Sequence, residues 1–190
     1  ALSDNAGPFI TKSTFKYSAS WAVFLDPEVA FKFTDNTVDS NTAPPPAQGA
    51  VLIGWDATIS ASAGTTSTIS GNTITNNGVS GDYRTLLKVN VDAPGMTIYI
   101  TDNTITGNYA GSGISTSLRG DDSNMVISQN EITNNFGRGI SISNTHVTNS
   151  TVTITDNLIK GNSGEGISAG ATSGGNITIS SNQIISNQGG

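Results

Sequence analysis

A nine-residue motif recurs along the chain, and its spacing constrains the fold more than any other feature. The motif has an apolar first and sixth residue and, in its regular copies, asparagine at the fourth and ninth, as in Ile100–Asn108 and Ile127–Asn135. The fourth residue falls at positions 13, 36, 72, 103, 130, 157 and 182, so successive copies lie 23, 36, 31, 27, 27 and 25 residues apart. A period of about 25 residues without a leucine signature fits one coil of three short strands and three turns. The repeat therefore predicts a solenoid of stacked coils.

The predicted fold class is all-β: a single-stranded, right-handed parallel β-helix, or solenoid, of about seven coils. Residues 1–190 are expected to form a single domain. Within this domain, residues 9–60 hold degenerate first coils and residues 61–190 hold the regular coils. A chain of this length is long enough to bury a sizeable core, which in a solenoid lies inside the coils.

Alternating apolar and polar residues predict the first strand of each coil. Every second residue from Met96 to Ile100 is apolar, so these side chains would face inward and the residues between them outward. Five residues separate Ile100 from the next apolar position, Ile105, which breaks the alternation and predicts a bend at Asp102–Asn103. Asparagine tolerates the left-handed conformation that such a bend needs.

Stacking the coils would bring equivalent asparagines into columns whose amides bond from coil to coil. The predicted structural ladder comprises Asn72, Asn103, Asn130, Asn157 and Asn182. A second column would mark the next corner, at Asn77, Asn108, Asn135, Asn162 and Asn187. Two rows of buried isoleucines are expected beside them, Ile100, Ile127, Ile154 and Ile179 in one and Ile105, Ile132, Ile159 and Ile184 in the other. Such rows would dominate stability, at about 1.5–3 kcal/mol for each buried aliphatic side chain.

The composition excludes several classes of function. Cysteine is absent and histidine occurs once, so thiolate chemistry, disulfides and histidine-rich metal sites are excluded. A net charge of −6 with no basic stripe argues against a nucleic-acid partner. No apolar run approaches the roughly 18 residues of a membrane span. Low charge combined with abundant threonine, serine, asparagine and glycine favours a secreted or cell-surface location.

The repeats resemble the right-handed parallel β-helix superfamily, with its pectate-lyase-like and NosD-like repeats, over roughly residues 9 to 187. Members of that superfamily cleave, epimerise or bind acidic polysaccharides, and others are phage tailspikes, adhesins or surface-layer components. The resemblance implies the fold, whereas the activity has to be argued from individual residues.

A polysaccharide lyase or epimerase needs carboxylates, often with Ca²⁺, and a basic side chain that removes a proton from the sugar. The candidate catalytic residues are Arg84, Lys88 and Arg119. Candidate carbohydrate-binding residues are Tyr83, Arg84 and Lys88, and candidate Ca²⁺ ligands are Asp92, Asp121 and Asp122. Solvated turns carry charges of the same kind, so these residues do not by themselves indicate an enzyme. Apart from this Ca²⁺ no cofactor is expected.

Three classes of function remain open. The favoured class is a non-enzymatic extracellular structural or adhesive solenoid, such as an adhesin or a subunit that self-assembles head to tail into a filament or sheath. Its partner would be another copy or the remainder of a longer solenoid. The second class is a polysaccharide-active enzyme, a lyase or epimerase, or a glycan-binding module with an extracellular polysaccharide as partner. The third is an ice-binding protein, suggested by the outward column Ser70, Thr101, Ser128, Thr155 and Ser180.

Overall fold

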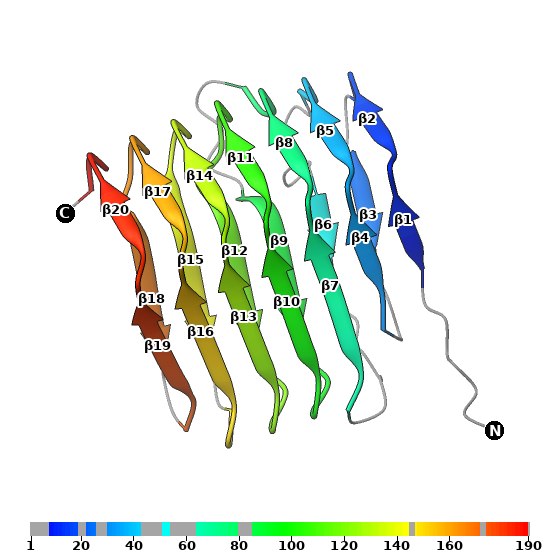
Figure 1. The fold of residues 1–190 in the computed structure, drawn as a ribbon, viewed down its shortest axis with the longest axis vertical. Coiled ribbons are helices and arrows are strands. Elements are labelled where there is room, and N and C mark those ends of the chain that lie inside the picture. The colour runs from blue at the N-terminus through cyan, green and yellow to red at the C-terminus, as the bar shows by residue number, and fades with distance from the viewer. Residues whose placement is uncertain are drawn as a thin grey trace.

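The computed structural model describes residues 8–18, 22–25, 30–42, 51–53, 64–79, 85–144, 147–171 and 174–189. Throughout this part the chain winds as an all-β solenoid, and no helix is present among the described residues. Three parallel sheets run along its length, because each strand pairs with the equivalent strand of the coils before and after it. The first described coil and the last coil lie at opposite ends of the solenoid (Figure 1).

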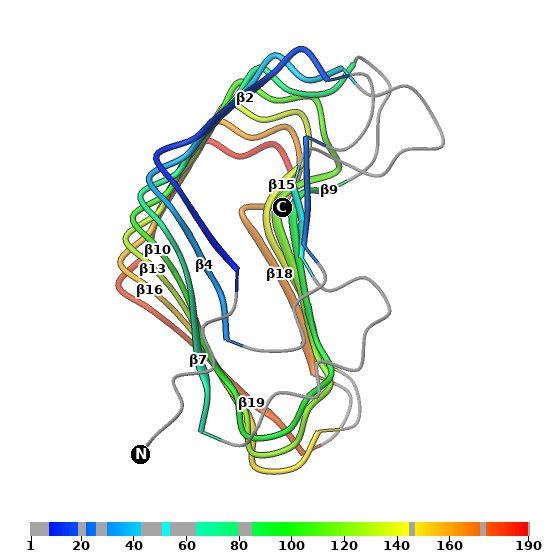
Figure 2. The ribbon, with the colours of Figure 1, turned by 90° about the vertical axis from the view of Figure 1, so that its right-hand side faces the viewer.

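The three sheets are named A, B and C in the order in which the chain visits them. Sheet A contains β1 (Phe9–Thr11), β4 (Lys32–Thr34), β7 (Thr66–Ser70), β10 (Thr97–Thr101), β13 (Asn124–Ser128), β16 (Thr151–Thr155) and β19 (Asn176–Ser180). Sheet B contains β2 (Thr14–Lys16), β5 (Thr37–Asp39), β8 (Thr73–Thr75), β11 (Thr104–Thr106), β14 (Glu131–Thr133), β17 (Leu158–Lys160) and β20 (Gln183–Ile185). Sheet C contains β3 (Val23–Leu25), β6 (Val51–Ile53), β9 (Thr85–Val91), β12 (Ser112–Leu118), β15 (Arg138–Asn144) and β18 (Ile167–Ala171). Figure 2, viewed along the solenoid, shows the three sheets as the sides of superposed coils.

The regular part of the solenoid has about five turns, each beginning with a five-residue strand of sheet A, from β7 to β19. Two irregular coils precede them, and all of their strands, β1 to β6, are three residues long. The expected count of about seven coils is therefore slightly too high, since about five turns are regular. The reason is that the degenerate motif copies near Ile10 and Phe33 form only short strands.

The core lies inside the coils, and the predicted alternation of side chains is confirmed. Met96, Ile98 and Ile100 are fully buried, whereas Tyr99 is 39% exposed on the outer face of sheet A. The two isoleucine rows are fully buried through Ile154 and Ile159. They are not buried in the last coil, where Ile179 is 47% and Ile184 is 50% exposed, because no later coil of the described chain covers them.

The bends between sheets A and B use a different residue from the one expected. The left-handed residue is Asp102, with φ of 58°, and not the adjacent Asn103. Asp35, Gln129, Asp156 and Ser181 take the same conformation at the equivalent positions of other coils. The asparagine itself is buried, and its side chain bonds to the neighbouring coils from inside the solenoid.

Two asparagine ladders tie the coils together. At the corner between sheets A and B, the ladder runs through Asn36, Asn72, Asn103, Asn130, Asn157 and Asn182. At the corner between sheets B and C, it runs through Asn41, Asn77, Asn108, Asn135, Asn162 and Asn187. Each side-chain Nδ2 of these ladders, up to Asn157 and Asn162, donates to the Oδ1 of the next asparagine at 2.8–3.1 Å. Both ladders therefore fix the register of successive coils independently of the loops between them.

A shorter serine ladder at the corner between sheets C and A was not foreseen. Met96 N donates to Ser123 Oγ at 3.1 Å, and Ser123 N donates to Ser150 Oγ at the same distance. Each hydroxyl in turn donates to a carbonyl of the preceding coil, Ala93 O or Gly120 O. Serine therefore satisfies buried backbone N–H groups here as asparagine does at the other two corners.

No helix in the described part of the chain is long and apolar enough to cross a membrane.

Candidate functional site

Three side chains line up along the corner between sheets B and C. Tyr109, Phe136 and Ser163 each follow the ladder asparagine of their own coil directly. Their backbone N–H groups donate to the ladder-asparagine carbonyls of the preceding coil, over 2.8, 2.8 and 3.0 Å. The three residues therefore occupy equivalent positions on successive coils and form a row parallel to the solenoid axis, here called the corner row.

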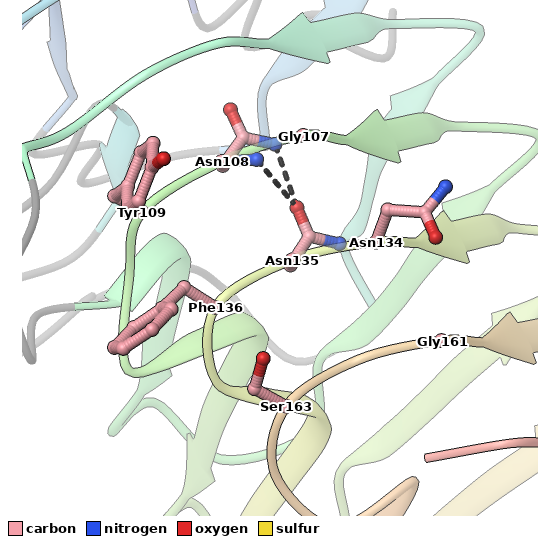
Figure 3. A pocket seen from close by; sticks show the side chains of 8 residues that line it. All are labelled: Gly107, Asn108, Tyr109, Asn134, Asn135, Phe136, Gly161 and Ser163. Atoms are coloured by element: carbon pink, nitrogen blue, oxygen red, sulfur yellow. Dashed lines mark hydrogen bonds between the residues drawn. The ribbon is translucent and has the colours of Figure 1, made fainter. Parts of the chain in front are cut away.

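The asparagine ladder anchors the backbone of the corner row. Asn108 donates to Asn135 Oδ1 twice, from its backbone N at 3.1 Å and from Nδ2 at 2.8 Å. Figure 3 shows this pair of bonds beside the rings of Tyr109 and Phe136, which project from neighbouring turns. Both asparagines are buried and form hydrogen bonds to the coils before and after their own. The backbone that carries the corner row is therefore held in place.

Two aromatic rings of the corner row are exposed side by side. Tyr109 and Phe136 are each 45% exposed, and their ring centroids lie 5.9 Å apart with planes inclined by 33°. Exposed rings that adjoin one another on a rigid support are characteristic of binding surfaces, because large apolar groups are otherwise buried.

Two hollows flank the corner row. The first has a volume of about 270 Å³ and is lined by Gly107, Asn108, Tyr109, Asn134, Asn135, Phe136, Gly161 and Ser163. The second has a volume of about 400 Å³ and is lined by Gly111, Phe136, Gly137, Arg138, Ser163, Gly164 and Glu165. Phe136 and Ser163 line both hollows, and the two adjoining hollows together are here called the corner groove.

The floor of the second hollow is kept low by glycines. A Cβ atom at Gly137 would collide with the backbone of Ala110 and Gly111 in the preceding coil. A Cβ at Gly164 would lie 2.9 Å from the carbonyl carbon of Gly137. The backbones of successive coils therefore approach closely here, and no side chain rises from these positions.

One ion pair supplies the charge of the groove. Arg138 Nε donates to Glu165 Oε2 at 2.7 Å, and Arg138 Nη2 donates to Oε1 at 3.5 Å. This hydrogen bond from Arg138 is the main reason why the pKa of Glu165 is lowered from its ordinary value. Glu165 is therefore ionised at neutral pH, and the two charges compensate each other.

The candidate catalytic and carbohydrate-binding residues from the sequence lie elsewhere or outside the described residues. Tyr83 and Arg84 belong to the part of the chain that is not described. Lys88 lies on β9 of sheet C, in register with Ser115 of the next coil. Arg119 follows β12, and its Nε lies 3.9 Å from Asp92 Oδ1. Lys88 and Arg119 do not line either hollow of the corner groove.

The candidate Ca²⁺ ligands are spread over the corner between sheets C and A. Asp121 Oδ1 accepts a hydrogen bond from Thr148 N, and Asp122 Oδ1 accepts one from Asn149 Nδ2 at 3.2 Å. Within the described ranges no three histidine, cysteine, aspartate or glutamate side chains gather into a metal site. A Ca²⁺ site at Asp92, Asp121 and Asp122 stays a prediction.

The outward hydroxyl column lies on sheet A. Strand pairing brings Ser70, Thr101, Ser128, Thr155 and Ser180 into one line across five coils. The adjacent line contains Tyr99 between Thr68 and Val126. The projecting Tyr99 ring interrupts the flat surface that an ice-binding face would need.

The sequence motif contained a signal for the corner groove. An aromatic residue directly follows the ninth motif residue in two successive copies, as Tyr109 follows Asn108 and Phe136 follows Asn135. The candidate residues expected from the sequence did not include this pair, because charged residues suited to catalysis were expected instead.

Comparison with known proteins supports the fold and leaves the groove unassigned. The family model described as the right handed beta helix region matches residues 1–190. Neither the curated proteins nor the solved structures yielded a match to this chain.

Proposed function

Since the chain belongs to the right-handed β-helix family, we propose that it is a non-enzymatic, extracellular adhesive solenoid that binds carbohydrate in its corner groove. The observation that carries this proposal is the pair of exposed rings, Tyr109 and Phe136, that stand side by side on a fixed base. Sugar rings present C–H groups on their faces, and the negative face of an aromatic ring attracts such groups. Polar groups beside the rings, from Asn134, Ser163 and Arg138, suit the sugar hydroxyls.

The charges in the groove favour binding over catalysis. Arg138 and Glu165 bond to each other at 2.7 Å, so neither is poised to exchange a proton with a substrate. A lyase or epimerase needs an unpaired base close to the sugar. An extracellular setting agrees with the low content of charged residues, 12%, and with the hydroxyl-rich outer strands.

The proposal is tested by affinity electrophoresis of the purified protein through gels that contain a polysaccharide. Tyr109→Ala and Phe136→Ala should each migrate faster than the wild type in a gel that retards the wild type. The matched control is Tyr99→Ala, which removes an exposed ring from the outer face of sheet A, outside the groove. Equal retardation of all four proteins would refute binding at the corner groove.

Head-to-tail stacking is a second candidate function, favoured by the face of the last coil. Ile179 and Ile184, the last members of the two inward isoleucine rows, are 47% and 50% exposed on this face. In each earlier regular coil the ladder asparagine donates its backbone N–H to the next asparagine Oδ1. A further coil, from a second copy or from the remainder of a longer solenoid, would offer the same acceptor to Asn182 and would cover the isoleucines.

Sedimentation velocity over a range of concentrations tests this second candidate. If copies stack, the wild type forms elongated oligomers and Ile184→Lys shifts the distribution to the monomer, because a charge in an apolar contact is costly. A heterologous contact of this kind generates open fibres unless its rotation closes a ring. A wild type that stays monomeric at high concentration rules out stacking between copies.

A further inference from the structure

The two hollows of the corner groove lie on opposite sides of the corner row. Gly107, Asn134 and Gly161, which line the first hollow, directly follow the strands of sheet B. Gly111 and Arg138, which line the second hollow, lie at the start of the sheet C strands. The corner row is therefore a ridge that runs between the hollows parallel to the solenoid axis.

The ridge changes height at Ser163. Tyr109 and Phe136 raise rings on two successive coils, whereas the third coil places a hydroxymethyl group at the equivalent position. Ser163 is exposed, and it lines both hollows. The two hollows are therefore connected across the small side chain of Ser163, beside the ring of Phe136.

The charge of the groove points to an uncharged ligand. Arg138 and Glu165 compensate each other, and the whole chain has a net charge of −6. A polyanion such as a uronate polymer would meet repulsion from this net charge and no unpaired cation among the lining residues. The polar groups that remain, an exposed amide, a hydroxyl and the outer edges of one ion pair, are donors and acceptors suited to hydroxyl groups.

The sizes of the hollows suit single sugar units. The volumes of about 270 and 400 Å³ lie just below and near the lower end of the roughly 300–1,000 Å³ of small-molecule pockets. Because both hollows are open to solvent and joined at Ser163, a chain of sugar units can occupy both and continue beyond them.

We propose that a neutral polysaccharide crosses the corner row through the gap at Ser163, with one sugar unit in each hollow and with Phe136 packed against the chain. This inference rests on the proposed carbohydrate-binding function and adds to it the class of glycan and the direction of binding. Asn134 contacts the unit in the first hollow. The Arg138–Glu165 pair contacts the unit in the second hollow.

The alternative direction is along the ridge, with successive sugar units stacked on Tyr109 and Phe136. The two directions make opposite predictions for Ser163→Phe. A ring at position 163 closes the gap between the hollows, yet it also lengthens the aromatic ridge by one coil. It therefore blocks a crossing chain and adds a contact to a chain that runs along the ridge.

The experiment measures retardation of the wild type, Ser163→Phe, Ser163→Ala, Phe136→Ala and Tyr99→Ala in gels of hydroxyethyl cellulose, laminarin, polygalacturonate and alginate. We expect retardation of the wild type in at least one of the two neutral gels and in neither of the acidic gels. Phe136→Ala should weaken this retardation about tenfold in apparent affinity, the factor that one aromatic contact supplies. Ser163→Phe should weaken it at least as much, because its ring closes the gap through which the chain crosses. Ser163→Ala keeps the gap open and removes only a hydroxyl, so it should weaken binding far less than Ser163→Phe does. Tyr99→Ala, outside the groove, should bind like the wild type.

Each outcome separates this inference from the proposed function. If Phe136→Ala weakens binding but Ser163→Phe strengthens it, the groove binds carbohydrate and the crossing direction is wrong. If Phe136→Ala weakens binding to the acidic polymers, the groove is the site and the neutral class is wrong. If none of the four polymers retards the wild type, or Phe136→Ala leaves retardation unchanged, the proposed function fails and this inference with it. Thermal melting of Ser163→Phe that matches the wild type shows that its effect on binding does not come from unfolding.

Discussion

Asn103 donates its backbone N–H and its side-chain Nδ2 to the same atom, Oδ1 of Asn130, over 3.0 and 2.9 Å. Asn130 repeats the arrangement with Asn157 on the next coil and donates back to Ile100 O on the preceding one. One buried amide therefore satisfies polar groups on three successive coils. Asparagine recurs where the solenoid bends because its side chain both donates and accepts hydrogen bonds. An aspartate side chain has no donor, and a leucine side chain has neither donor nor acceptor.

The first prediction concerns this ladder. Asn130→Leu should lower the free energy of unfolding by about 1–3 kcal/mol, because the N–H of Asn103 and the carbonyl of Ile100 lose buried partners. Asn157→Leu should behave in the same way. Chemical denaturation followed by circular dichroism measures the difference. The matched control is Asn176→Leu, which makes the same replacement at an exposed strand position and should change stability by less than about 0.5 kcal/mol. Equal stability of all these variants would contradict the structural role of the ladder.

The second prediction concerns Gly139, near the start of β15 in sheet C. A Cβ at Gly139 would collide with Ile159 Cγ2 and with the carbonyl oxygen of Gly166 on the next coil. Gly139→Ala should therefore cost about 1–3 kcal/mol of stability, as overpacking does in tight cores. Gly170, on the next strand of the same sheet, has open space around the position of a Cβ. Gly170→Ala should be neutral or slightly stabilising in the same denaturation experiment, and a comparable loss in both variants would show that crowding is not the cause.

The third prediction concerns the pH dependence of stability at Asp39. Hydrogen bonds from Asn76 and Thr75, and then Lys16, lower the pKa of Asp39 from 3.8 to about 2. Because the folded pKa lies below the unfolded one, the contribution is present above pH 3.8 and is lost as the pH falls towards 2. Asp39→Asn should be less stable than the wild type at pH 7, by about 0.5–1 kcal/mol, and most of this difference should be lost by pH 2.

Thermal melting at several pH values between 2 and 7 tests this prediction. Asp102→Asn serves as the control, because Asp102 is an exposed turn residue and asparagine tolerates its left-handed backbone. A gap between Asp39→Asn and the wild type that persists unchanged to the lowest pH would mean that ionisation of Asp39 does not stabilise the fold.

The fourth prediction concerns catalysis. Incubation with pectate, alginate or hyaluronate, with and without Ca²⁺, should give no unsaturated product that absorbs in the ultraviolet. A pectate lyase assayed in parallel shows that the measurement works. Steady product formation by the wild type that disappears in Lys88→Ala or Arg119→Ala would identify an enzyme and contradict the adhesive proposal.

The sequence by itself determined the coil. Local alternation from Met96 to Ile100 decides which side chains face inward, and the period of about 25 residues decides that coils stack. The same alternation of apolar and polar residues repeats in each copy of the motif. It can therefore be recognised in the sequence without knowing which residues contact each other in the folded protein. The repeat is less informative where its copies degenerate, and this is why the expected total of about seven coils is slightly too high.

The tertiary structure decided which residues outside the repeat come together. Tyr109 and Phe136 are 27 residues apart, as are Arg138 and Glu165, while Asp39 meets Thr75 from 36 residues away. Successive copies of the motif lie 23 to 36 residues apart, so a fixed distance along the chain does not give the register between coils. The ladders fix that register, and they do so by hydrogen bonds that form only when the coils are stacked. The sequence therefore specified the scaffold, whereas the corner groove exists only through contacts between neighbouring coils.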